Sequence, residues 1–165
     1  MKTALVIPVR LDSSRLPRKA LKHIDGKTVI QRVADRCMET HIPTYVVTDS
    51  LEINDQLYGP NVIFQDKKAE SGTERIVNAL DHIDADNIIN VQGDQPFISP
   101  KAILEMYEFM MKHPLYNVVT PVAKHNPTKN TDPSKCKVVL STSGRAIYFS
   151  RSPIPYNAVD MWGHL

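Results

Sequence analysis

The run Ala4–Ile7, ended by Pro8, is the feature that most limits the folds open to this chain. Four consecutive apolar residues are typical of a strand buried on both faces of a parallel sheet, and the proline cannot donate the next ladder hydrogen bond. Open α/β sheets bind their ligands at the carboxyl ends of such strands. We therefore expect an α/β fold with a ligand site in the residues that follow Pro8.

The loop after this strand is rich in polar groups. Residues 8–19 carry four cations and two hydroxyls, namely Arg10, Arg15, Arg18, Lys19, Ser13 and Ser14. Guanidinium and ammonium groups bind phosphate oxygens, so the loop favours a triphosphate as partner. The alternative is a solvated basic loop, which is what most charge runs are. Since the net charge is only +2, the sequence gives no reason to expect a nucleic-acid or membrane partner.

The rest of the chain alternates predicted strands and helices, as in a sheet covered by helices. Strands are predicted at 44–48, 62–65, 88–91 and 118–122, helices at 29–38, from 51, at 71–83 and at 100–111, and a hairpin at 137–149. A length of 165 residues suits a single domain over 1–165. No signal-peptide pattern is present, which predicts a cytoplasmic protein. Cys37 and Cys136 lack zinc-site spacing and are predicted to be reduced structural thiols.

Acidic residues follow two of the predicted strands. Asp94 comes after the strand at 88–91 and beside Gly93, a good position for holding Mg2+ against phosphate oxygens, although a single aspartate in a turn is often only a turn residue. Asp49 either touches a ligand or caps the helix from Leu51, and capping is favoured. Ser71–Arg75 begins a helix and is interpreted either as a capped start or as an anion site.

Taken together, these stretches resemble the sugar-activating nucleotidyltransferases, and most closely the 3-deoxy-manno-octulosonate cytidylyltransferases. The family pattern Pro-x-Arg-x-x-Ser-x-Arg-Leu-Pro-x-Lys is met at 8–19, Ser-Gly-Thr-Glu-Arg at 71–75, Val-Gln-Gly-Asp-x-Pro at 91–96 and Tyr-Phe-Ser-Arg-x-x-Ile-Pro at 148–155. Arg18 stands where the family has glycine, which predicts a stiffer and more basic loop tip. Ala69-Glu70 and Gln95 replace the family's His-Gln and Glu.

The resemblance implies a Rossmann-like nucleotidyltransferase sheet and transfer of CMP from CTP to an acidic 2-keto sugar, best matched by 3-deoxy-D-manno-octulosonate (Kdo), for lipopolysaccharide or surface polysaccharide synthesis. It implies that Arg10, Arg15 and Lys19 clamp the triphosphate and that Asp94 binds Mg2+. The other nucleotide-binding positions that it implies are Pro8, Ser13, Ser71, Gly72 and Arg75. It places Gln92, Arg151 and His164 against the sugar.

Residues 162–165 resemble the beginning of a family strand that normally continues toward a second metal-binding aspartate. The resemblance therefore implies a domain that is incomplete at its C-terminus. It leaves open a homodimer or second chain that completes the fold, a fragment, or a chain that has lost catalysis. Three other functions stay open: a cytidylyltransferase for a sialic-type or amino-Kdo sugar, a nucleotide-binding module without turnover, and a structural protein that keeps the fold.

Overall fold

A computed structural model of the chain describes residues 1–11, 16–65, 67–123 and 132–155. The structure divides into two compact units, Met1–Val119 and Thr120–Leu165. The single domain over 1–165 remains a prediction.

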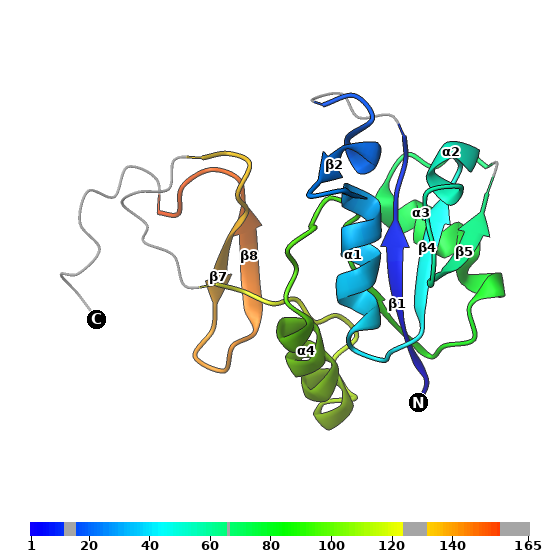
Figure 1. The fold of residues 1–165 in the computed structure, drawn as a ribbon. Helices are drawn as coiled ribbons and strands as arrows, with labels where there is room; N and C mark the ends of the chain where they lie inside the picture. The colour runs from blue at the N-terminus through cyan, green and yellow to red at the C-terminus, as the bar shows by residue number, and fades with distance from the viewer. Residues whose placement is uncertain (12–15, 66, 124–131, 156–165) are drawn as a thin grey trace. The chain divides into compact units, whose positions relative to one another are not determined.

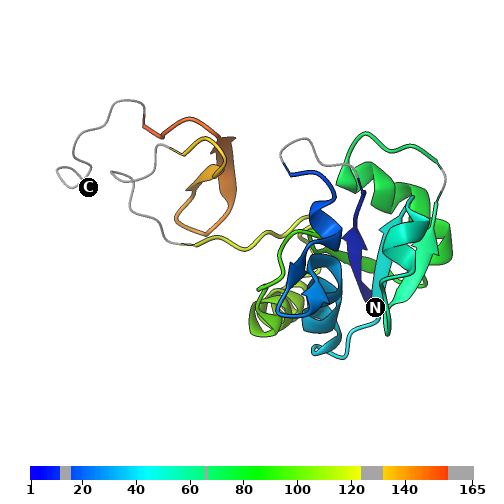
Figure 2. The same ribbon diagram turned by 45° about the horizontal axis from the view of Figure 1, so that its top comes forward.

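The first unit is built on a parallel sheet of four strands in the order β5-β4-β1-β6. Figure 1 labels β1, β4 and β5 of this sheet, and Figure 2 gives a second view of the unit. The strands are β1 (Thr3–Pro8), β4 (Thr44–Thr48), β5 (Asn61–Phe64) and β6 (Asn87–Asn90). In the register, Leu5 of β1 lies opposite Thr44 of β4 and Ile89 of β6. The predicted α/β class and these strands are confirmed.

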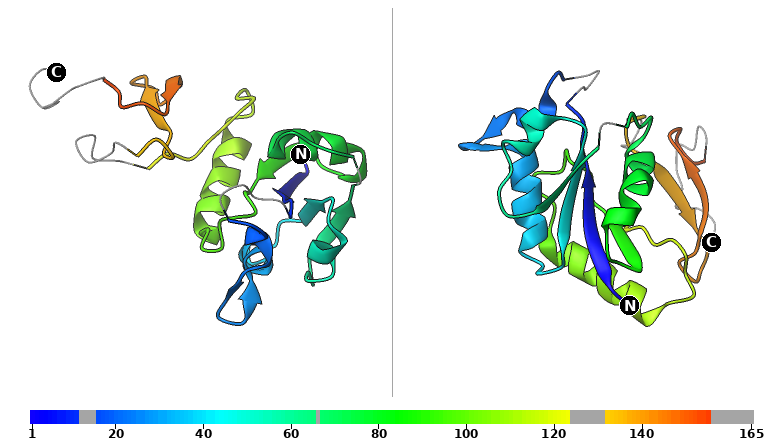
Figure 3. Two further views of the ribbon diagram at one scale, coloured as in Figure 1. Left: turned by 90° about the horizontal axis from the view of Figure 1, so that it is seen from above. Right: turned by 90° about the vertical axis from the view of Figure 1, so that its right-hand side faces the viewer.

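Helices cover both faces of this sheet, as the view along its edge in Figure 3 shows. They are α1 (Val29–Met38), α2 (Leu51–Asn54), α3 (Gly72–Ala79) and α4 (Pro100–Lys112), with short 3-10 turns at Lys19–Leu21 and Leu80–His82 and a small hairpin of β2 (His23–Ile24) and β3 (Lys27–Thr28). Thr28, Ser71 and Ser99 cap α1, α3 and α4 through their side-chain oxygens. Ser50 caps α2 in the same way. The predicted helices are therefore confirmed, and a hydroxyl cap fixes where each of these four begins.

The alternation of side chains along β1 gives the unit two apolar cores. Leu5 and Ile7 pack with α1 and with Ile103 of α4, whereas Ala4 and Val6 pack with α3 on the opposite face. All six residues of β1 are buried. The continuous apolar run at the start of the sequence thus has the role that it predicts, a strand covered on both faces.

The second unit contains the predicted hairpin, formed by β7 (Lys137–Leu140) and β8 (Ala146–Ser150) in antiparallel pairing. Gly144 in its turn has a φ of 81°, a conformation that glycine adopts without steric cost. The strand predicted at 118–122 is wrong: these residues form no regular structure, and Val118 is 87% exposed. A strand needs a neighbour for its backbone groups, and none of the described strands pairs with this segment.

None of the helices within the described parts of the chain has the length and apolar character needed to span a membrane.

The two thiols are expected to differ sharply in reactivity. Both are free, as predicted, but only Cys37 is part of a core; Cys136 is exposed, so its prediction as a structural thiol is wrong. Burial raises the pKa of Cys37 to about 12, so at pH 8 it is an uncharged, shielded thiol. Iodoacetamide at pH 8 should modify Cys136 in the native protein and both residues in urea, as read by mass spectrometry. Equal labelling of the two thiols in the native protein would contradict this packing.

Candidate active site

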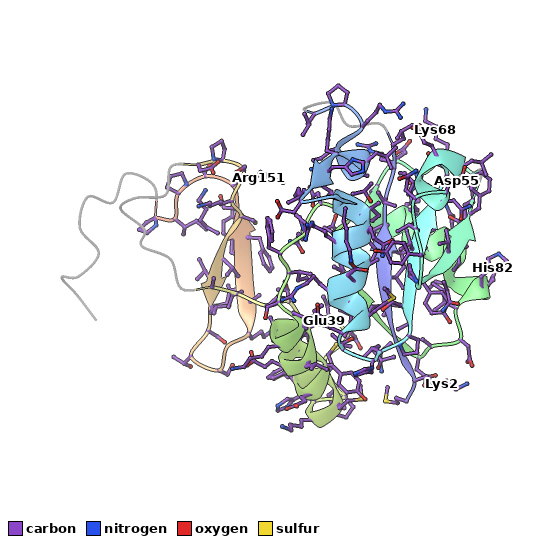
Figure 4. The ribbon with its side chains drawn as sticks, in the orientation of Figure 1. Lys2, Glu39, Asp55, Lys68, His82 and Arg151 are labelled. Carbon is purple, nitrogen blue, oxygen red and sulfur yellow. The ribbon has the colours of Figure 1, made fainter. Side chains whose placement is uncertain are left out.

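A cavity of about 400 Å³ lies at the carboxyl ends of β1 and β6 in the first unit. Its lining comes from four short segments: residues 8–10 after β1, residues 19 and 20, residues 69–72 with Arg75 at the start of α3, and residues 92–94 after β6. Figure 4 labels Lys68, which precedes the third segment, at one end of the sheet and Lys2 at the other. Pro8, Arg10, Lys19, Ser71, Gly72, Arg75, Gln92 and Asp94, eight of the positions that the sequence singles out, thus meet in one place.

The strand order explains why the segments converge. The chain passes from β1 to β4 on one side and later returns to β6 on the other, so a crevice forms at the carboxyl ends of β1 and β6. Two glycines let the crossing loops approach each other. A Cβ on Gly93 would lie 3.2 Å from the Pro8 carbonyl oxygen, and one on Gly72 would lie 3.2 Å from Cγ of Pro8. Because glycine has no Cβ, the two loops can come this close to Pro8, and both glycines form part of the cavity wall.

Lys19 and Asp94 face each other in this cavity. The Lys19 Nζ donates to Asp94 Oδ2 at 2.5 Å, and the two side chains are 38% and 49% exposed. A pair this open gains little stability from its contact and can rearrange around a ligand at little cost. The structure therefore brings a cation and a carboxylate from segments 75 residues apart to one point of the cavity.

The surroundings of Asp94 suit an Mg2+ ion that takes one ligand from the protein and most of its other ligands from the nucleotide and water. Among the residues that the structure describes, no group of three or more His, Cys, Asp or Glu side chains is arranged to hold a metal ion. Mg2+ is commonly bound by one or two carboxylates together with substrate phosphates and water. A half-exposed carboxylate beside a lysine suits that mode, in which the nucleotide brings most of the oxygen ligands.

The start of α3 combines capping with a place in the cavity wall. Ser71 Oγ accepts from the Glu74 backbone N–H at 3.1 Å, and Glu74 Oε2 accepts from the Glu70 N–H at 2.6 Å. The capped-helix interpretation is thus confirmed, and Ser71 also lines the cavity. Its hydroxyl hydrogen is still free to be donated to a ligand, because capping uses only the oxygen.

Arg75 and Asp49 form a pair that the sequence did not predict. Arg75 Nη2 donates to Asp49 Oδ2 at 2.7 Å, and the arginine side chain is only 4% exposed. The favoured interpretation of Asp49 as the cap of α2 is wrong, because Ser50 Oγ accepts the Ile53 N–H in that role. The only hint in the sequence was the position of Asp49 at the carboxyl end of a strand, and its partner lies 26 residues further on.

The remaining predicted positions fall into two groups. Gln92 lines the cavity and donates from Nε2 to Asn90 Oδ1 at 3.0 Å. Arg151, labelled in Figure 4, belongs to the second unit and donates to the carbonyl oxygens of Pro133 and Ser134 at 3.1 and 3.3 Å. Ser13, Arg15 and His164 lie outside the described residues. The roles of all these residues stay predictions.

Arg18 adopts the left-handed backbone conformation, with φ 56° and ψ 31°, and its guanidinium is paired with Glu52 of α2. The expectation of a more basic loop tip is therefore wrong in part, because Glu52 neutralises the added cation. The backbone conformation itself explains why glycine suits this position.

Arg18→Gly is accordingly expected to raise the free energy of unfolding by up to about 1 kcal/mol, because glycine removes the cost of the left-handed conformation and the exposed ion pair is worth less than that cost. Glu52→Gln removes the pair and leaves the backbone unchanged, so it should change stability by less than about 0.5 kcal/mol. Urea unfolding of both variants measures the difference. A clear loss of stability in Arg18→Gly would show that the Glu52 contact outweighs the backbone strain.

Comparison with known proteins agrees with this geometry. The cytidylyltransferase family model matches residues 4–161. The 3-deoxy-manno-octulosonate cytidylyltransferase of Rickettsia prowazekii is 41% identical, over 98% of this chain and 68% of its own length. The enzyme of that name from Chlorobium limicola is 40% identical, over 100% of this chain and 72% of its own. The chain therefore belongs to the cytidylyltransferase family, a group of nucleotidyltransferases.

Solved structures support the same assignment. A CMP:2-keto-3-deoxy-manno-octonic acid synthetase in complex with CTP superposes with a TM-score of 0.84 at 37% identity, covering 95% of this chain and 67% of that one. A nucleotidyl transferase from Methanothermobacter has a TM-score of 0.60 at 21% identity, which supports the fold alone.

Proposed function

We propose that this chain catalyses transfer of CMP from CTP to 3-deoxy-D-manno-octulosonate, with release of pyrophosphate. The observation that carries the proposal is the cavity at the carboxyl ends of β1 and β6, in which Lys19 Nζ lies 2.5 Å from Asp94 Oδ2. The names of the relatives, and the CTP bound to the similar structure, support both the nucleotide and the sugar. Mg2+, a cytoplasmic location and a place in lipopolysaccharide synthesis belong to the proposal as implications of the family resemblance.

The reaction needs neutralisation of charge more than it needs a protein nucleophile. The anomeric hydroxyl of the sugar attacks the α-phosphorus of CTP and releases its proton to water. The new O–P bond forms as the bond to the bridging oxygen breaks, and pyrophosphate leaves with the electron pair. Negative charge grows on the leaving pyrophosphate. Lys19 and Arg10 line the cavity and would bind phosphate oxygens there, which stabilises that charge.

Asp94 would hold Mg2+ through its carboxylate. Mg2+ held there would supply positive charge that offsets part of the charge on the phosphate groups. As the ligand enters, Lys19 would exchange its contact with Asp94 for a contact with the phosphates, which the exposure of both side chains allows. Gln92 would face the sugar with its side-chain oxygen Oε1, because its bond to Asn90 uses only the side-chain nitrogen Nε2.

Titration calorimetry on the chain of 165 residues is the direct test. CTP with Mg2+ is titrated first and ATP serves as the control nucleotide; Kdo is then added and pyrophosphate is measured. Selective CTP binding followed by pyrophosphate release would support the whole proposal. Binding without release would leave a nucleotide-binding module, and a folded chain that binds no nucleotide would refute the proposal.

A substrate panel identifies the sugar. The same pyrophosphate assay with a sialic-type sugar and an amino-Kdo analogue separates the proposed substrate from its alternatives. We expect Kdo to give the highest kcat/KM, because the relatives that share about 40% of their residues with this chain are named for it.

A further inference from the structure

One donor group in the cavity wall is buried without a partner. Arg75 lines the cavity and its side chain is 4% exposed. Its Nη2 donates to Asp49, whereas its Nη1 is buried and has no hydrogen-bond partner. An unsatisfied N–H in a buried guanidinium is costly, and native proteins rarely leave one unless a ligand or water completes it. The geometry therefore points to a ligand atom that accepts from Nη1.

Asp49 fixes the direction of this donor. The guanidinium is a flat, rigid fork, so a hydrogen bond to Nη2 at 2.7 Å also sets the plane in which Nη1 lies. Asp49 follows β4, which lies on the side of β1 opposite β6 and Asp94. Two strand spacings separate the ends of β4 and β6, or about 10 Å. Arg75 is thus anchored through Asp49 at the end of β4, whereas Asp94 follows β6.

The net charge of the Arg75–Asp49 pair indicates which part of a nucleotide accepts a hydrogen bond from Arg75 Nη1. Arg75 and Asp49 together are neutral, and the arginine side chain is only 4% exposed, compared with 38% for Lys19. Lys19 can leave Asp94 for a ligand because both side chains are exposed, whereas the buried guanidinium of Arg75 is held by Asp49 and its charge is partly neutralised there. A neutral, oriented donor suits an uncharged acceptor, such as a carbonyl oxygen or ring nitrogen of the base.

We propose that Asp49 is a positioning residue: it holds the Arg75 guanidinium so that Nη1 donates to an uncharged acceptor in the nucleoside half of the bound nucleotide. This inference rests on the proposed function, because it takes CTP as the ligand. It assigns Asp49 a role in nucleotide affinity that acts only through Arg75. Asp49 itself makes no contact with the phosphates or with Mg2+.

The test compares two ligands that differ in the nucleoside. Dissociation constants for CTP and for inorganic tripolyphosphate, each with Mg2+, are measured by calorimetry for the wild type and for Asp49→Ala. We expect the CTP constant to rise about tenfold, the effect of one hydrogen bond from a charged group, and the tripolyphosphate constant to change by less than about twofold. The matched control is Asp55→Asn, an exposed aspartate at the end of α2 that is labelled in Figure 4 and lies outside the cavity lining; neither constant should change.

A double-mutant cycle separates positioning from a general loss of structure. Lysine cannot hold two donors in one plane, so Arg75→Lys should remove the contact by itself. In that background, Asp49→Ala should change the CTP constant by less than about twofold. Circular dichroism and thermal unfolding check each variant. If Asp49→Ala does not fold, Asp49→Asn replaces it, with an expected loss of about threefold, because the amide keeps an acceptor oxygen but not the charge.

The outcomes are distinct. Unchanged CTP binding in a folded Asp49→Ala variant overturns the inference and leaves the proposed function standing. The inference is also overturned if Asp49→Ala weakens the binding of CTP and of tripolyphosphate equally. It is overturned as well if Asp49→Ala weakens CTP binding by the same factor in the Arg75→Lys background as in the wild type. A wild-type chain that binds neither ligand refutes the proposed function and this inference together.

Discussion

Asp94→Asn is expected to lower the rate of pyrophosphate release by about a hundredfold to a thousandfold, the loss typical when one preorganised charge is removed from a transferring phosphoryl group. Asparagine keeps the size of the side chain and one acceptor oxygen but loses the negative charge that would hold Mg2+. The affinity for Mg2+ should therefore fall as well. A titration of turnover against Mg2+ measures both effects.

Asp84→Asn is the matched control for this variant. Asp84 is also an exposed aspartate paired with a lysine, Lys2, and it does not line the cavity. Its substitution should leave turnover unchanged. Since the Lys19–Asp94 pair is half exposed, Asp94→Asn should also unfold at nearly the wild-type temperature. Full turnover by a folded Asp94→Asn variant would remove the metal assignment from this residue.

Lys19→Met should reduce kcat/KM by a similar factor, about a hundredfold or more, for a different physical reason. Methionine fills the space of the lysine stem but brings no charge to the phosphates. It also leaves Asp94 without its partner, so an uncompensated carboxylate would face the triphosphate and repel it. CTP affinity without Mg2+ should fall more than affinity with Mg2+, because the ion screens that repulsion.

Lys22→Met tests whether any lysine near this loop would have the same effect. Lys22 lies three positions further along, is exposed and does not line the cavity. Its loss lowers the net charge of the chain by the same amount. If Lys22→Met and Lys19→Met weaken CTP binding equally, the effect is long-range attraction between charges and not a contact in the site.

The sequence was a good guide to the fold wherever one segment carried its own signal. The apolar run at 4–7 and the helical spacing at 29–38 needed no partner to be recognised. The segment at 118–122 shows the limit of this reasoning. Its β-branched residues favour a strand locally, but a strand forms only beside another, and that information is not local.

The residues of the candidate site also fall into those that a local motif identifies and those that only tertiary packing determines. Lys19 and Asp94 could be singled out because each lies in a short, distinctive motif, and the structure then brought them within 2.5 Å. Asp49 could not be assigned correctly, because its neighbour Ser50 offers an equally good cap and its real partner is in a helix far along the chain. Pairing between a strand end and a distant helix is decided by tertiary packing, which a local pattern does not encode.

The double burial of β1 has a consequence for how the site responds to change. Because β1 joins both apolar cores, the backbone that carries Pro8 and Val9 is the part of the unit least able to open without global unfolding. The side chains above it, Lys19 and Asp94, are exposed and free to exchange partners. The cavity therefore combines a rigid base with adaptable side chains, so substitution of those side chains changes ligand binding and turnover while β1 preserves the fold.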